Sequence, residues 1–324
     1  MDLKQLVAVV TVSEVGSVTR AARLLHVVQP SVTRHVQTLE AELGTALFER
    51  TRQGMRTTPA GERFVERARR ALQELERARA EIRPDTEEVH GTVTLGLLES
   101  TTEMLAGPLA RAVEEHLPHV ELRLLSAYSG HLQQWLDTGE VDLSLTYNVT
   151  ATGSVAVVPL LHESLWAVAP AAAGLAAEQP LPWADLWRYP VVLPVRGHGL
   201  RSLVDDAVTA TGATPRIAVE TNSMPLQKEL VHAGRGWTVL PAAGVARDIE
   251  AGRFSGTPLV EPEISRTVVL GHQRDLRMSR AVAAVARETR RAVDELVTTG
   301  RWPGSRRADE GRRTASAPRA TSSP

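Results

Sequence analysis

The stretch GSVTRAARLLHVVQPSVTRHVQTLEAELG, residues 16–44, decides the fold of the first part of this chain. Its second half places Val28, Val32, Val36, Leu39 and Leu43 at helical spacing, which predicts a helix at about 29–42 with one buried face. The other side of this helix carries a dense row of polar side chains. The pattern is therefore that of an amphipathic helix whose polar face is either an ordinary solvated surface or a binding surface.

Two shorter helices are predicted before it. Leu3, Leu6, Val7 and Val10 mark a helix of about ten residues, and Ser17 is the candidate N-cap of a second helix at 18–25. The residues expected to be buried in that second helix are Ala21, Ala22, Leu24 and Leu25. Three short helices joined by tight turns form the unit that inserts its last helix into the major groove of DNA.

The polar row then has a candidate role. The residues that we expect to face DNA are Gln29, Pro30, Ser31, Thr33, Arg34, His35 and Gln37. Glutamine pairs with adenine in a bidentate manner and arginine with guanine, while serine and threonine serve phosphates or bases. Gln29, Ser31 and Arg34, with His35, are therefore the candidates for base readout.

A short basic hairpin follows. Residues 47–50 and 55–57 read as two strands around a turn at 52–54. This wing places Arg50, Arg52 and Arg56 where they contact phosphates or enter the minor groove. Thr58 is the predicted N-cap of the next helix, with Pro59 at its first position.

These segments together resemble the DNA-binding domain of the LysR-type bacterial transcriptional regulators. The resemblance is carried by residues 16–44 and by LFERTRQGMRTTPAG, residues 47–61. In that family the segment matching VQPSVTR reads close to S-Q-P-A-L-S-R, so Gln29, Pro30 and Arg34 match, whereas Val28 lacks the usual hydroxyl. The resemblance implies an N-terminal, mainly α-helical winged helix-turn-helix domain at 1–58.

The next segment, 59–84, is predicted to be a long linker helix. Its apolar positions form a narrow stripe, and these are Phe64, Ala68, Ala71 or Leu72, Leu75, Ala78 and Ile82. A stripe this narrow pairs with a single other helix, which favours a dimeric coiled coil over a helix lying on its own domain. Similarity to the family also implies dimerisation through this helix.

From residue 90 the pattern changes to alternating strands and helices. Strands are predicted at 91–98, 120–128 and 141–147, with helices at 101–117 and 130–139, as in a parallel α/β sheet. A second lobe at about 164–268 precedes a final strand at 267–272 and a helix near 279–298. Residues 90–300 thus resemble the α/β two-lobed, periplasmic-binding-protein-like effector domain of the same family. Residues 96–148 look most like the branch related to nitrogen-assimilation control proteins.

Ligands of open α/β sheets bind at the carboxyl ends of strands. Position in the family suggests that polar residues in four such loops line an inter-lobe cleft, and the candidates are Ser100, Thr101, Ser129, Arg196, His198 and Asn222. Arg196 is a candidate because a guanidinium pairs with a carboxylate in a bidentate manner, although Glu99 nearby would oppose an anion or neutralise Arg196 itself. Helix capping by the serines and threonines, and a solvated arginine, are the ordinary alternatives.

Charge is distributed unevenly along the chain. Residues 1–83 carry a net charge of +4, residues 84–300 of −9 and residues 301–324 of +4. A basic N-terminal segment on an acidic body suggests a polyanionic partner. Residues 301–324 are predicted to be a disordered basic tail, because residues 303–324 contain no apolar residues that would pack.

The composition excludes several other classes. The chain has no cysteine, which rules out disulfides and thiolate metal sites and suits a cytoplasmic location, and no apolar run of 18 residues predicts a membrane span. We find no catalytic motif, metal-ligand spacing or cofactor fingerprint, so neither a metal nor a cofactor is expected and an enzyme has no positive support.

The leading hypothesis is therefore a DNA-binding regulator whose second domain senses a small molecule. Resemblance implies a homodimer or homotetramer on an imperfect inverted repeat in double-stranded DNA, and a small organic acid is one candidate effector. The alternative is a small-molecule binding module or an enzyme on the two-lobed body, with the N-terminal helices used only for dimerisation.

Overall fold

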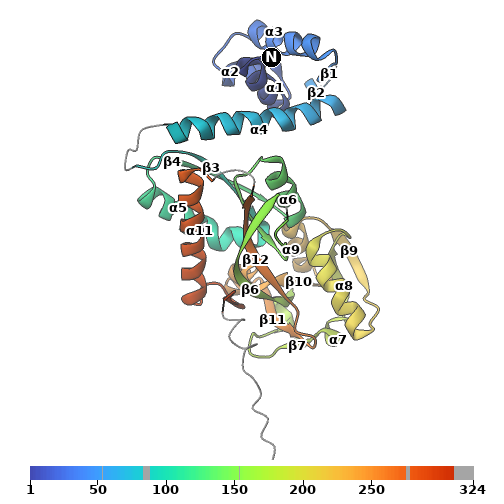
Figure 1. Cartoon of the computed structure of the whole chain (residues 1–324). Coiled ribbons are helices and arrows are strands. Elements are labelled where there is room, and N and C mark those ends of the chain that lie inside the picture. Colours follow the sequence, from blue (N-terminus) through green and yellow to red (C-terminus); the bar gives the residue numbers. More distant parts are fainter. Residues whose placement is uncertain (53, 83–87, 153, 275–277, 310–324) are drawn as a thin grey trace, which may run out of the picture. The chain divides into compact units, whose positions relative to one another are not determined.

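The computed structural model describes residues 1–52, 54–82, 88–152, 154–274 and 278–309. The chain divides into two compact units, Met1–Glu87 and a larger unit that begins at Glu88. Figure 1 shows the elements of both. The predicted turn residue Gln53, the end of the linker at 83–84 and residues 310–324 of the predicted tail lie outside the described residues.

The N-terminal unit begins with three helices, α1 (Leu3–Val15), α2 (Val18–Leu24) and α3 (Gln29–Leu43). Ser17 accepts a hydrogen bond from the Arg20 N–H and caps α2, as predicted. The helix α3 starts without a side-chain cap, because Val28 occupies the N-cap position and has no hydroxyl or amide to offer. The departure from the family pattern at Val28 thus leaves the start of α3 uncapped by any side chain.

The three helices bury a common core. The predicted burial of Ala21, Ala22, Val32, Val36 and Leu39 is confirmed. The predicted burial of Val28, Leu24 and Leu43 is wrong, since their exposed fractions are 67%, 61% and 40%. Leu24 and Leu43 are the last residues of α2 and α3, and Val28 is the N-cap residue of α3, so all three lie at helix ends.

A two-stranded hairpin follows, formed by β1 (Phe48–Thr51) and β2 (Gly54–Thr57) with Phe48 opposite Thr57. Glu40 of α3 anchors it, because its Oε1 accepts hydrogen bonds from the N–H groups of Leu47 (2.7 Å) and Phe48 (3.0 Å). Gly54 has a φ of +127°, and a Cβ there would lie 2.4 Å from the carbonyl oxygen of Gly16. A glycine is therefore required where the hairpin meets the α1–α2 turn.

The long helix α4 (Pro59–Ile82) closes this unit, and Thr58 caps it by accepting the Gly61 N–H at 3.0 Å. Its apolar stripe splits into two parts. Val65 and Ala68 are buried in the core of the unit and Phe64 and Leu72 pack against that core. Farther along, Ala71, Leu75 and Ala78 are exposed, with Leu75 at 46%. The helix therefore lies on its own domain over its first half only; the Ile82 side chain is outside the described residues.

The C-terminal unit is built on one mixed sheet in the order β4-β3-β5-β12-β6-β10-β8-β9. Its first lobe contains β3 (Gly91–Leu98), α5 (Glu99–His116), β4 (Val120–Ala127), α6 (Ser129–Thr138) and β5 (Leu143–Tyr147). These strands pair in parallel, as the alternating pattern predicts, with Gly91 opposite Val120. The helix α11 (Arg280–Thr298) packs against α5 and β3 (Figure 1).

Two long strands join the lobes. The strand β6 (Val155–Pro170) pairs antiparallel with β12 (Ser265–Gln273) up to Ser164 and with the strands of the second lobe from Leu165 onward. The sheet is therefore mixed and not purely parallel, because both connecting strands run against their neighbours.

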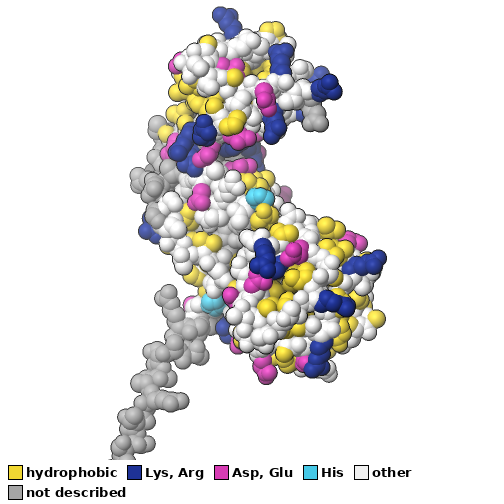
Figure 2. Space-filling model, turned by 90° about the vertical axis from the view of Figure 1, so that its right-hand side faces the viewer, with side chains coloured by type: hydrophobic (Ala, Val, Ile, Leu, Met, Phe, Trp, Pro, Cys, Tyr) yellow, Lys and Arg dark blue, Asp and Glu magenta, His cyan; other side chains and the backbone are white. Residues whose placement is uncertain are grey.

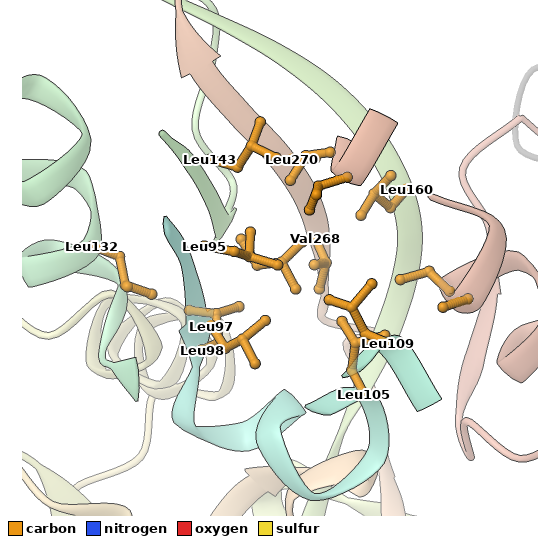
Figure 3. Packing of buried hydrophobic residues seen from close by; sticks show 14 of the residues in the cluster. Leu95, Leu97, Leu98, Leu105, Leu109, Leu132, Leu143, Leu160, Val268 and Leu270 are labelled. Carbon is orange, nitrogen blue, oxygen red and sulfur yellow. The ribbon is translucent and has the colours of Figure 1, made fainter. Parts of the chain in front are cut away.

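The second lobe comprises shorter elements. These are η1 (Ala171–Ala173), β7 (Leu181–Pro182), α7 (Trp183–Leu186), β8 (Val191–Pro194), α8 (Gly199–Thr211), β9 (Ile217–Thr221), α9 (Met224–His232), β10 (Trp237–Pro241), η2 (Ala242–Gly244), α10 (Ala246–Glu250) and β11 (Phe254–Val260). Its core is separate from that of the first lobe. Figure 3 shows the first-lobe core, where leucines of β3, α5, α6 and β5 meet Leu160 of β6 and Leu270 of β12.

The prediction of a tail from residue 301 is wrong for residues 301–309. Trp302 is fully buried in the first-lobe core, and β13 (Ser305–Arg307) pairs antiparallel with β6, with Ser305 opposite Glu163. A strand edge accepts any segment with free backbone donors and acceptors, so this pairing does not need apolar side chains. That is why composition alone misses it.

Candidate nucleic-acid interface and ligand cavity

The polar row of α3 lies on the surface of the N-terminal unit. Gln29, Pro30, Arg34 and Gln37 are exposed, whereas Ser31, Thr33 and His35 are half-buried. Helical periodicity explains this, since the opposite positions are in the core. All the α3 residues that are predicted to contact DNA are therefore at least partly accessible on the surface of this helix.

Two details distinguish members of this row. The hydroxyl of Thr33 donates to the backbone oxygen of Gln29 (3.2 Å) and accepts from its side-chain amide (3.1 Å), so Thr33 orients Gln29. Arg34 makes no ion pair with any residue in the described part of the chain. Its guanidinium is therefore available for an external acceptor.

The predicted wing residues are also on the surface. Arg50, Arg52 and Arg56 are all exposed, and Arg56 lies opposite Glu49 in the hairpin. Figure 2 shows several Lys and Arg side chains on the surface of the N-terminal unit. The combination of a polar helix face and a basic hairpin can bind a polyanion through phosphates while the helix contacts base edges.

The second candidate site is a cavity between the two lobes of the C-terminal unit. Its volume is about 40 Å³, room for roughly three water molecules. The lining residues come from the ends of strands and the first turns of helices, and they are Leu98, Glu99, Ser100, Tyr128, Ser129, Tyr147, Pro194, His198, Leu200, Thr221, Asn222, Ser223, Met224, Gln227, Leu240, Pro241 and Arg266.

Four of the predicted effector residues line this cavity: Ser100, Ser129, His198 and Asn222. Thr101 does not, because it is buried and its hydroxyl donates to the Leu98 carbonyl in the first turn of α5 (2.9 Å). Arg196 does not either, because it is exposed in the loop after β8.

The arginine in the cavity is Arg266 of β12, which sequence reasoning missed. Its Nε donates to Oε1 of Glu163 at 2.6 Å, and its Nη2 donates to the Ser100 hydroxyl at 2.6 Å. The indole N–H of Trp302 donates to the other oxygen of Glu163 at 3.0 Å. Glu163 and Arg266 are 1% and 3% exposed, so this is a buried and well-partnered ion pair. The sequence contains one signal for this ion pair: Glu163 and Arg266 are charged residues within β6 and β12, strands that also contain apolar runs.

Two other titratable groups near Arg266, His198 and Tyr147, are held neutral. Burial, with a smaller contribution from the charge of Arg266, lowers the pKa of His198 to about 4. Its Nδ1 accepts the Leu200 N–H at 3.2 Å and caps α8. Burial likewise raises the pKa of Tyr147, whose ring lies under the Arg266 guanidinium at 4.5 Å.

The two lobes are bridged beside the cavity by α5 and α9. Glu99 Oε2 accepts the N–H of Met224, the first residue of α9, at 3.3 Å. One turn farther along both helices, Lys228 approaches Glu103 at 3.5 Å, and it also pairs with Asp248 at 2.7 Å. These contacts join the first two turns of α5 to the first two turns of α9.

The described residues contain no helix that is long and apolar enough to span a bilayer and no cluster of three potential metal ligands.

Comparison with known proteins identifies the family to which both parts of the chain are similar. Residues 3–62 match the model of the bacterial regulatory helix-turn-helix protein, lysR family, and residues 86–294 match the LysR substrate binding domain. The regulator BbuR of Bordetella bronchiseptica is 28% identical over 90% of this chain and 90% of its own length. The nitrogen assimilation regulatory protein nac of Klebsiella aerogenes is 29% identical over 74% of this chain and 78% of its own, which supports the resemblance to that branch.

Solved structures agree in fold. A full-length OxyR variant from Pseudomonas aeruginosa has a TM-score of 0.70 at 24% identity, covering 90% of this chain and 94% of that one. Full-length CbnR in complex with its target DNA has a TM-score of 0.66 at 24% identity, covering 90% and 100%. With its substrate-binding-domain match spanning more than half of its length, the chain belongs to the LysR family of transcriptional regulators, whose members join a DNA-binding helix-turn-helix domain to an effector-binding domain.

Proposed function

We propose that α3 is the recognition helix of this regulator and that Gln29, Ser31, Arg34 and His35 contact base edges in the major groove. The observation that carries this proposal is that Arg34 is exposed on one face of α3, while the opposite face of the helix is buried in the core. Arg34 pairs with guanine, and Gln29, oriented by Thr33, pairs with adenine. Pro30, Thr33 and Gln37 complete the contacted surface of the helix.

The wing contributes to the affinity for DNA and not to the base preference. Arg50, Arg52 and Arg56 are exposed side chains that neutralise phosphates without reading sequence. The uncapped start of α3 adds backbone N–H groups, which also favour a phosphate.

We propose that the regulator binds an imperfect inverted repeat as a homodimer or homotetramer. Support comes from the second half of α4, where Ala71, Leu75 and Ala78 leave an apolar stripe exposed on one helix. Such a stripe fits a second copy of the same helix. A regulator of promoters acts on chromosomal DNA, so a cytoplasmic location belongs to the same proposal.

A gel shift with DNA from upstream of the protein's own gene tests the recognition helix. Arg34→Ala should weaken binding to the preferred site by about 1–3 kcal/mol and relax the base preference at one position. Arg67→Ala is the matched control, because it removes the same charge from an exposed position on α4. Unchanged affinity and preference in Arg34→Ala would contradict the assignment.

We propose further that the inter-lobe cavity is the effector site and that it binds its ligand without converting it. Ser100, Ser129, His198 and Asn222 line it, and Arg266 replaces Arg196 as the arginine of the site. A thermal-shift screen of small organic acids and amino acids on the full chain tests this. Asn222→Trp fills the mouth of the cavity from an exposed position and should abolish any stabilisation found; stabilisation that survives would place the ligand elsewhere.

A further inference from the structure

The cavity has an unbalanced charge. The formally charged side chains that line it are Glu99 and Arg266, and burial keeps the His198 imidazole and the Tyr147 phenol neutral at pH 7. Arg266 already faces Glu163 at 2.6 Å. Glu99, by contrast, has no cationic partner in the part of the chain that the structure describes. The uncompensated charge of the cavity is therefore negative.

The carboxylate of Glu99 is only partly used by the protein. Its Oε2 accepts the Met224 N–H at 3.3 Å, and its second oxygen makes no hydrogen bond with any described residue. A carboxylate accepts about four hydrogen bonds, so this group retains capacity for a donor in the cavity. A ligand with a protonated amine would supply both the missing charge and the missing donors.

Glu99 requires a hydrogen-bond donor from the ligand, whereas Tyr147 requires a hydrogen-bond acceptor. Its side chain is 5% exposed, it lines the cavity, and its hydroxyl makes no well-formed hydrogen bond in the described structure; the Leu200 N–H and the Arg266 guanidinium near it are both donors and leave its proton free. A buried hydroxyl whose proton has no acceptor is uncommon and costly, because it has lost its hydration. As a neutral phenol it can donate to an acceptor such as a carboxylate oxygen.

Two of the helix starts around the cavity are already occupied. The first N–H groups of α8 are capped by His198, and those of α9 by Glu99 and Ser223. The start of α5 has no side-chain cap. Because Glu99 is the first residue of α5, its carboxylate disfavours an anion at that helix start, and the Tyr147 hydroxyl remains as the donor for an anionic group.

We infer that the effector is a small zwitterion of the amino-acid class, with its ammonium group on Glu99 and its carboxylate toward the Tyr147 hydroxyl. This rests on the proposed role of the cavity as the effector site. It narrows the class from organic acids in general to organic acids that also carry a protonated amine.

The test uses the full chain and three sets of probes: the natural amino acids, the carboxylic acids that lack their α-amino group, and the amines that lack their carboxylate. Melting temperature is measured with each probe, and titration calorimetry gives the affinity of those that stabilise. At least one amino acid should stabilise the protein and bind about tenfold to hundredfold more tightly than its des-amino acid, the range expected for one charge-assisted hydrogen bond.

Glu99→Gln isolates the group responsible. Glutamine keeps an oxygen for the Met224 N–H but has no charge, so the preference for the amino acid should fall to within about threefold while folding is retained. Glu103→Gln is the matched control: it removes a charge one turn along α5, on the same bridge to α9 but outside the cavity lining, and should keep the preference.

The outcomes separate the two levels of the proposal. A des-amino acid that binds as tightly as its amino acid, or a preference that survives Glu99→Gln, would overturn the zwitterion assignment and leave the cavity as the effector site. Binding that is unaffected by Asn222→Trp would overturn the site itself. Absence of stabilisation by every amino acid would also overturn the inference.

Discussion

Removal of the buried arginine is the perturbation whose consequence follows most directly from the structure. In Arg266→Met the carboxylate of Glu163 would remain in the core with one remaining donor, the Trp302 indole at 3.0 Å. Breaking a buried ion pair on one side costs about 3–5 kcal/mol, because an uncompensated charge stays buried. In a domain of about 220 residues each kcal/mol lowers Tm by roughly 2–4 °C, so a decrease of roughly 6–20 °C is expected.

The double variant Arg266→Met with Glu163→Leu should recover most of this loss. Replacing both charges with apolar side chains removes the unpaired group, and such replacements are often neutral or stabilising. Thermal unfolding of the wild type, both single variants and the double variant, followed by circular dichroism, gives the coupling energy between the two residues.

Two results would refute this reasoning. One is an Arg266→Met variant that melts within about 2 °C of the wild type, a shift of only about 1 kcal/mol or less. The other is a double variant whose destabilisation equals the sum of the two single values, since additivity means that the pair is not coupled.

Three further predictions concern other parts of the chain. Since the pKa of His198 is lowered to about 4, the unfolded chain binds a proton that the folded one does not as pH falls from about 6.5 to about 4. Stability should therefore decline across that window by up to about 3 kcal/mol, and His198→Asn, which keeps a helix cap, should remove this part of the pH dependence of urea midpoints. Gly54→Ala should destabilise the N-terminal unit by about 1–3 kcal/mol in thermal melts, because of its φ of +127° and the Gly16 carbonyl oxygen 2.4 Å from the added Cβ; a neutral effect would show that the hairpin can shift. Arg52→Ala should weaken binding to specific and random DNA alike and reduce the slope of log K against log salt by about 0.9, whereas a change in base preference would argue for a readout role.

The residues of the recognition helix could be assigned from the sequence because their arrangement is local. Burial of Val32, Val36 and Leu39 follows from spacing within one helix, and that spacing also fixes which residues face outward. Caps are equally local: Ser17 and Thr58 bond to N–H groups three residues later. The exceptions are Val28, Leu24 and Leu43, which lie at helix ends and are exposed.

In the effector domain, the predicted strands and helices agree with the structure where hydrophobic alternation is clear, as in β3, α5, β4, α6 and β5. Residues such as Ser100 and Ser129 were found because they follow strands, and strand ends meet at one edge of a parallel sheet. Arg196 also follows a strand, but it is exposed and does not line the cavity, because position in a loop does not determine side-chain direction.

What the sequence determined by itself was thus the family, the outward face of α3 and the succession of strands and helices along the first lobe. The tertiary structure alone decided the character of the cavity. Arg266, Glu163, Ser100 and Trp302 come from four separate segments, and only the antiparallel pairing of β6 with β12 and the burial of the C-terminal segment bring them together. Hydrophobic periodicity indicates which face of a segment is buried in a core, but it does not indicate which distant segment packs against that face. Pairing between distant charges is therefore visible only once the chain has folded.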